Sequence, residues 1–139
     1  MRGTARGTTL LVTCAVVALA DVAGAARDVP PRRKQALLEW LRAASYRATY
    51  VPEPDVHASA SGAHGLNVRT YYNPILVDDL RAGRVRFRKG AAMVKELYFG
   101  GREQVIGYSV MRKLRRRSGT TGKGWLFYET LDGSNRDAF

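Results

Sequence analysis

The segment AMVKELYFGGREQVIGYSVMRK, residues 92–113, decides the fold of this chain. It contains two stretches rich in β-branched and aromatic residues, Ala92–Phe99 and Gln104–Lys113, separated by the pair Gly100-Gly101. Because such residues favour strands and paired glycines favour a tight turn, the segment predicts an antiparallel hairpin. A further aromatic stretch, Trp125–Leu131, predicts the next strand of the same meander.

The residues before this hairpin predict two helices and one more strand. The leucines of residues 32–47 recur at helical spacing, which indicates an amphipathic helix. Residues 51–65 are rich in Pro, Ser, Ala and Gly and predict a loop, whereas Leu66–Tyr72 has the alternation of a strand. Asn73-Pro74 combines a capping side chain with a following proline, so a short helix over 74–82 should begin there. This order of elements predicts an α+β domain with an antiparallel β-sheet, an N-terminal amphipathic helix and a short crossing helix.

Residues 1–26 have the pattern of a secretory signal peptide. Arg2 and Arg6 precede a short apolar run, Leu10–Ala20, and small residues follow at 23–26. The run is too short to span a bilayer as a helix, so we expect export to the periplasm and a mature domain of residues 27–139. Cys14, the one cysteine of the chain, lies in the signal. The mature domain would therefore have no disulfide, thiolate nucleophile or sulfur-ligated metal.

The chain is strongly basic, with 23 Lys and Arg against 12 Asp and Glu and a formal net charge of +11. Such an excess favours anionic partners or surfaces, and export argues against nucleic acid as the partner. The densest block of cations is residues 112–117 (RKLRRR), which is typical of a solvated strand end and turn.

Few residues of the chain carry an obvious catalytic or metal-binding pattern. His57 and His64 are the two histidines, and their spacing does not call for a metal, so we expect structural or surface roles and no metal site. The sequence contains no phosphate-binding glycine loop, serine nucleophile elbow or His-Glu-x-x-His. Asp78 and Asp79 follow the proposed helix start and are best explained by interaction with the helix dipole.

Lys95 is the more informative residue. Period-two alternation places Met93, Lys95 and Leu97 on one face of their strand, and Val94 and Glu96 on the other. A lysine on a buried apolar face needs a partner or a shifted pKa. On periodicity alone, the simpler interpretation is that Lys95 faces solvent and the Val94 face is buried.

Four segments, taken together and in order, resemble the cytochrome P-460 family of exported haem proteins. They are HASASGAHGLNVRTYYNP, FRKGAAMVKELY, GYSVMRKL and GWLFYE, and the resemblance covers roughly residues 36 to 133. It implies an antiparallel sheet with helices that encloses a c-type haem, with five-coordinate iron open to a small ligand.

The resemblance also implies a function and a site. Members of this family oxidise hydroxylamine or bind nitric oxide, so the expected partners are a small nitrogen-containing ligand and a redox partner protein for electron transfer. In the hydroxylamine-oxidising members a lysine of the V-K-E-L strand is bonded to the porphyrin, and the matching residue is Lys95. Lys95 is therefore the candidate haem cross-link, and Met93, Lys95 and Leu97 are the candidate cofactor-binding residues.

One departure from the family pattern leaves a second interpretation open. The family attaches haem through Cys-x-x-Cys-His near the C-terminus, and this sequence reaches Phe139 without that motif. We interpret the sequence as C-terminally incomplete, so that any hydroxylamine oxidation requires haem attached beyond residue 139. The alternative is a haem-free exported binding module whose basic surface takes an anionic partner. The residues that follow Phe139 would distinguish the two.

Overall fold

The computed structural model describes residues 29–60, 67–99, 103–116 and 122–131. The proposed signal peptide, the Gly100-Gly101 turn and His64 lie outside these residues. The described helices are α1 (Lys34–Arg42), the 3₁₀ helix η2 (Ser45–Ala48) and α2 (Pro74–Arg81). The described strands are β1 (Val51–Pro52), β2 (His57–Ala58), β3 (Asn67–Tyr72), β4 (Ala92–Tyr98), β5 (Val105–Lys113) and β6 (Trp125–Leu131).

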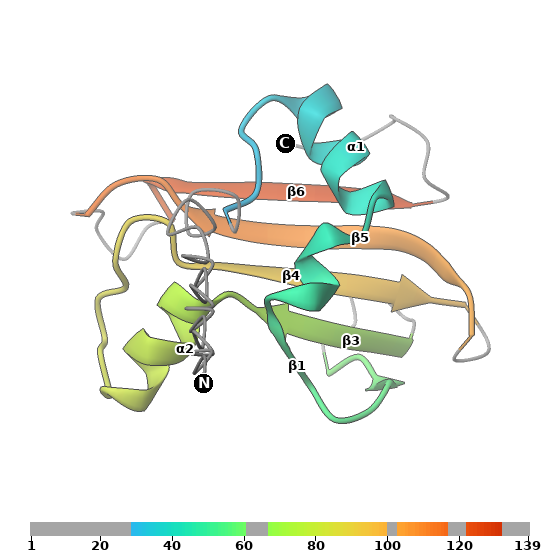
Figure 1. Cartoon of the computed structure of the whole chain (residues 1–139), viewed down its shortest axis with the longest axis horizontal. Coiled ribbons are helices and arrows are strands. Elements are labelled where there is room, and N and C mark those ends of the chain that lie inside the picture. Colours follow the sequence, from blue (N-terminus) through green and yellow to red (C-terminus); the bar gives the residue numbers. More distant parts are fainter. Residues whose placement is uncertain (1–28, 61–66, 100–102, 117–121, 132–139) are drawn as a thin grey trace, which may run out of the picture.

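These strands form one antiparallel sheet in the order β1-β3-β4-β5-β6, with β2 also paired to β3 (Figure 1). The register places Val94 opposite both Tyr71 and Val110, and Val110 opposite Tyr128. The four strands expected from the sequence are confirmed to within one residue at each end, and so is the α+β class with an antiparallel sheet. Alternation and aromatic content were sufficient because each is a local property of the strand.

The hydrophobic core lies between α1 and one face of the sheet. Leu37 and Leu41 of α1 have no exposed surface and pack against Tyr71, Val94 and Val110. Figure 1 shows α1 crossing this face, with α2 at the end of the sheet where β4 begins. The prediction of an amphipathic helix is therefore confirmed, because the leucine side of α1 packs on the sheet.

Two expectations for the first half of the chain are wrong in detail. The first helix ends at Arg42 rather than at residue 47, because Ala44 adopts a left-handed backbone conformation (φ 51°) and the chain continues as η2. That change of direction carries Tyr46 into the core. Residues 51–65 are not wholly a loop, because β1 and β2 pair with the edge strand β3. Neither feature could be predicted from the neighbouring residues in the sequence, because both depend on contacts with the sheet.

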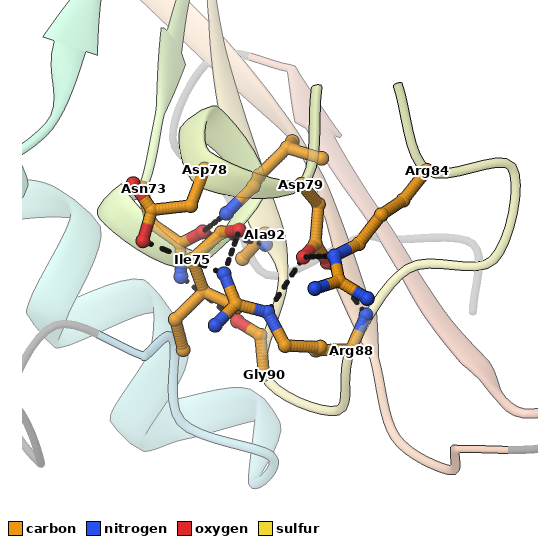
Figure 2. Close-up of polar contacts among 9 residues, drawn as sticks. Asn73, Ile75, Asp78, Asp79, Arg84, Arg88, Gly90 and Ala92 are labelled. Atoms are coloured by element: carbon orange, nitrogen blue, oxygen red, sulfur yellow. Dashed lines mark hydrogen bonds and ion pairs between the residues drawn. The ribbon is translucent and has the colours of Figure 1, made fainter. Parts of the chain in front are cut away.

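The predicted cap of the second helix is confirmed and has a second role. The Asn73 side-chain oxygen accepts hydrogen bonds from the backbone N–H of Leu76 (2.9 Å) and of Ala92 (3.0 Å). Its amide donates to the carbonyl of Gly90 at 2.8 Å (Figure 2). One buried side chain therefore caps α2 and ties it to the start of β4.

In the part of the chain that the structure describes, no helix is both long and apolar enough to cross a membrane.

Candidate functional site

The structure places Met93, Lys95 and Leu97 on the sheet face opposite to α1. Met93 and Lys95 are half-buried, whereas Leu97 has no exposed surface. Met93 lies opposite Met111 of β5, and Met111 lies opposite Phe127 of β6, which is 46% exposed. This face therefore presents an apolar row across three strands that ends in an exposed aromatic side chain.

Lys95 belongs to the next row of the same face, which is polar. Its opposite residues in the register are Thr70 of β3 and Ser109 of β5, and Ser109 in turn lies opposite Glu129. The face that α1 covers carries Val94, as expected for a buried alternate face. Lys95 is only half-buried, and a lysine is tolerated at such a position because its alkyl chain can be buried while the ammonium stays hydrated.

A group of hydrogen-bonded side chains around one carboxylate, which we call the Glu53 cluster, lies beside the Lys95 row and was not predicted from the sequence. Glu53, between β1 and β2, accepts hydrogen bonds from the Thr70 backbone N–H (2.7 Å) and the Tyr72 hydroxyl (2.9 Å). His57 lies 3.1 Å from the same carboxylate. Partial burial alone would raise the pKa of Glu53, but these hydrogen bonds outweigh it and lower that pKa below its ordinary value.

His57 is not placed to ligate a metal. Its Nε2 contacts Glu53 (3.1 Å) and its Nδ1 contacts the Ala58 carbonyl (2.9 Å), and both partners are hydrogen-bond acceptors. The carbonyl of Ala58 and then Glu53 raise the pKa of His57, because the imidazolium donates to both. In that protonated form, neither ring nitrogen keeps a lone pair for a metal. Across the described residues, no group of three or more His, Cys, Asp or Glu is arranged to hold a metal ion.

The Glu53 cluster predicts a pH-dependent contribution to stability. Because the folded-state pKa of Glu53 is lowered, its contribution is complete above the ordinary pKa of 4.5 and is lost as pH falls through the folded-state pKa. Glu53→Gln should lower the free energy of unfolding by about 1 kcal/mol at neutral pH and by much less at an acidic pH below the folded-state pKa of Glu53. Urea unfolding at both pH values measures this. Asp55→Asn, an exposed neighbour, is the control and should have no such pH-dependent effect.

A second carboxylate, Glu96, is fully buried under η2. It accepts hydrogen bonds from the Tyr46 hydroxyl (2.5 Å), Arg47 Nε (2.7 Å) and the Tyr98 hydroxyl (2.5 Å). All three partners are donors, so Glu96 acts as an acceptor through both oxygens, which is the role of an ionised carboxylate. Burial and then the hydrogen bond to Glu96 raise the pKa values of Tyr46 and Tyr98.

The Glu96 cluster ties η2 to the sheet. Tyr46 also contacts the rings of Trp40 (centroids 5.3 Å apart) and Tyr71 (5.3 Å), so one side chain joins the core to the carboxylate. Alternation places Glu96 on the buried Val94 face, which is the one sequence signal for this site. Its partners could not be predicted, because Tyr46 and Arg47 are about 50 residues away in sequence.

The helix-dipole explanation of Asp78 and Asp79 is wrong, because neither lies in the first turn of α2. Asp79 has no exposed surface and accepts hydrogen bonds from the backbone N–H of Arg88 (2.7 Å) and from Arg88 Nε (2.5 Å). Arg84 Nε lies 3.3 Å from the same carboxylate (Figure 2). Asp78 is exposed and has a longer contact of 3.4 Å with Arg88. Asp79 therefore fixes the loop between α2 and β4.

Comparison of the chain with family models, curated proteins and solved structures finds no match.

Proposed function

We propose that this chain belongs to an exported periplasmic haem protein of the cytochrome P-460 type. It would oxidise hydroxylamine or bind nitric oxide, and the sheet face opposite α1 would line the haem. The observation that carries the proposal is the placement of Lys95 between Met93 and Leu97 on that face, beside a partly exposed apolar row. The family resemblance assigns the porphyrin bond to the same lysine.

The residues of this face suit one side of a porphyrin but supply no iron ligand. Met93, Met111 and Phe127 offer apolar surface of the kind that a tetrapyrrole buries, and Lys95 offers a cation for a propionate or a nucleophile for the ring. Leu97, already buried, would form the apolar floor of the site. His57 does not serve as the axial ligand, because both of its nitrogens contact acceptors.

When bound, haem supplies the coordination of the small nitrogenous ligand and the electron transfer. The chain's own residues then have three tasks. The apolar row excludes water from the porphyrin face, which strengthens electrostatic interactions there. The half-buried Lys95 places a positive charge beside the cofactor, flanked by the hydroxyl groups of Thr70 and Ser109. The Glu96 cluster behind the sheet holds β4 in register with η2, so that Lys95 keeps its position.

The test of this proposal is Lys95→Ala in the haem-loaded protein. The haem absorption spectrum should change, and any haem bond to the peptide that contains residue 95 should disappear from the mass spectrum, because the variant removes the nitrogen that would form it. Lys123→Ala removes an exposed lysine before β6 and is the matched control, for which both readouts should stay as in the parent protein. An unchanged spectrum in Lys95→Ala, together with a parent protein in which the peptide containing Lys95 carries no haem, would refute the role of Lys95.

The proposed export is tested separately by the mass of the mature protein. We expect cleavage close to residues 25–27, because the small residues there follow the apolar run at the spacing of a signal-peptidase site. A product that retains Met1 in the cytoplasm would contradict export.

A further inference from the structure

One end of the sheet carries a dense set of exposed cations, which we call the basic edge. The loop after α2 and the ends of β5 and β6 meet there: the Gly90 N–H donates to the Lys113 carbonyl (2.9 Å), and the Leu114 N–H to Gly124 (2.8 Å). In Figure 1 this is the left end of the sheet, next to α2. The exposed cations of the basic edge are Arg81, Arg84, Arg86, Arg88, Lys89, Arg115, Arg116 and Lys123.

The basic edge is not simply the RKLRRR block of the sequence. Two of that block's cations are used within the fold, so the expectation that the block is wholly solvated is wrong. Lys113 is only 5% exposed, with its ammonium 4.7 Å from the centre of the Trp125 ring. Arg112 donates to the Pro30 carbonyl, and burial lowers its pKa. Among the described residues of the block, Arg115 and Arg116 are exposed, and they follow Lys113, whose carbonyl accepts from the Gly90 N–H of the α2–β4 loop.

Most of this charge is not neutralised within the described part of the chain. Asp79 and Asp78 pair with Arg84 and Arg88. The other cations of the basic edge have no carboxylate within ion-pair distance among the described residues: Arg81, Arg86, Lys89, Arg115, Arg116 and Lys123. A concentration of like charge at one end of a small domain repels itself, and an anionic surface would relieve that repulsion.

An exposed apolar side chain lies in the middle of these cations. Val85 is 93% exposed, directly between Arg84 and Arg86, and Leu80 at the end of α2 is 51% exposed. A valine so exposed contributes almost no buried area to the fold. Apolar side chains flanked by Arg and Lys are the composition of segments that lie in the headgroup region of a membrane.

The loop that carries Val85 is held in shape by the rest of the fold. Arg88 is bound to the buried Asp79, and the Phe87 ring packs edge-on against Trp125 at 6.0 Å between centroids. The loop is therefore already ordered before a partner binds, and binding would cost little conformational entropy.

We propose that the basic edge docks on the surface of an anionic phospholipid bilayer. Its unpaired arginines and lysines bind headgroup phosphates, and Val85 inserts at the boundary between headgroups and acyl chains. A complex with an acidic protein would use the same cations but would not require an apolar tip, so the exposure of Val85 favours the lipid surface. This inference does not depend on haem.

Vesicle co-sedimentation of the full chain tests the proposal. Vesicles that contain phosphatidylglycerol should bind the protein, and vesicles of phosphatidylcholine alone should not. Arg86→Gln should weaken binding about fivefold, since each cation near an anionic surface contributes a factor of that order. Arg42→Gln makes the same change of charge in the last turn of α1 and is the control, which should bind like the parent protein.

The apolar contribution is tested by Val85→Asp against Phe99→Asp, which alters another exposed apolar residue (74% exposed) just after β4. Val85→Asp should weaken binding roughly tenfold or more, and Phe99→Asp should not. Equal effects of the two variants, or no effect of Arg86→Gln, would overturn the proposal. Binding that polyglutamate abolishes and that Val85→Asp leaves unchanged would also overturn it, because charge alone, as in a complex with an acidic protein, would then account for the binding.

Discussion

Replacement of Glu96 by alanine should lower the free energy of unfolding by about 3–5 kcal/mol. The carboxylate is fully buried and receives three hydrogen bonds, from Tyr46, Arg47 and Tyr98. Its removal leaves two phenolic hydroxyls without their acceptor, at about 1–3 kcal/mol for each group that stays unsatisfied. Loss of the contact with Arg47 costs less free energy, because the Arg47 side chain is 47% exposed and can be hydrated. For a domain of ordinary stability, a loss of this size approaches the whole free energy of folding.

Graded variants separate the charge of Glu96 from its packing. Glu96→Gln keeps the size and one acceptor, so it should cost less than Glu96→Ala. Tyr46→Phe keeps the ring contacts with Trp40 and Tyr71 and should cost about 1–2 kcal/mol for the lost hydrogen bond. Glu39→Ala is the control, because Glu39 is an exposed glutamate of α1 that accepts a hydrogen bond from the exposed Gln35. Urea unfolding measures all four. A cost for Glu96→Ala no larger than that for Glu39→Ala would show that the cluster does not stabilise the fold.

The contrast between these clusters and the strands shows what the sequence could reveal. The strands β4, β5 and β6 were predictable because alternation and aromatic content are read within a few residues. The Asn73-Pro74 start of α2 is also local, and the cap was confirmed in atomic detail. By the same logic, period two was enough to place Met93, Lys95 and Leu97 together on one face. It was not enough to say which elements cover either face of the sheet.

The features that were missed depend on partners distant in sequence or on sheet edges. The end of α1 at Arg42 follows from the left-handed residue Ala44, which allows Tyr46 to reach Glu96. The two-residue strand β1 contains a proline and exists because β3 offers an unpaired edge. Glu53 resembles an ordinary loop carboxylate until the fold brings Tyr72 beside it. Buried acids were therefore the least predictable part of the chain. A carboxylate can be buried only where hydrogen-bond donors surround it, and several of those donors are distant in sequence.

Asp78 and Asp79 provide the sharpest test of this point, since they are adjacent and chemically identical. Asp79→Ala should lower the free energy of unfolding by about 2–3 kcal/mol, because the backbone N–H of Arg88 loses a charged acceptor at 2.7 Å. This is below the usual cost of breaking a buried ion pair, because Arg84 and Arg88 are about half exposed and can be hydrated. Asp78→Ala should change the free energy of unfolding by no more than about 0.5 kcal/mol, as expected for an exposed pair.

The helix-dipole explanation and the loop-anchoring explanation of these acids predict different results for that experiment. If both acted through the helix dipole, the two alanine variants would have similar, small effects that salt would screen. If Asp79 instead holds the α2–β4 loop, Asp79→Asn should recover part of the loss, because its amide oxygen still accepts from the Arg88 N–H. Hydrogen exchange at that N–H should also become faster in Asp79→Ala than in Asp78→Ala, since opening the loop no longer breaks a charged hydrogen bond. Equal exchange rates in the two variants would mean that the loop is held by the Phe87–Trp125 contact and not by Asp79.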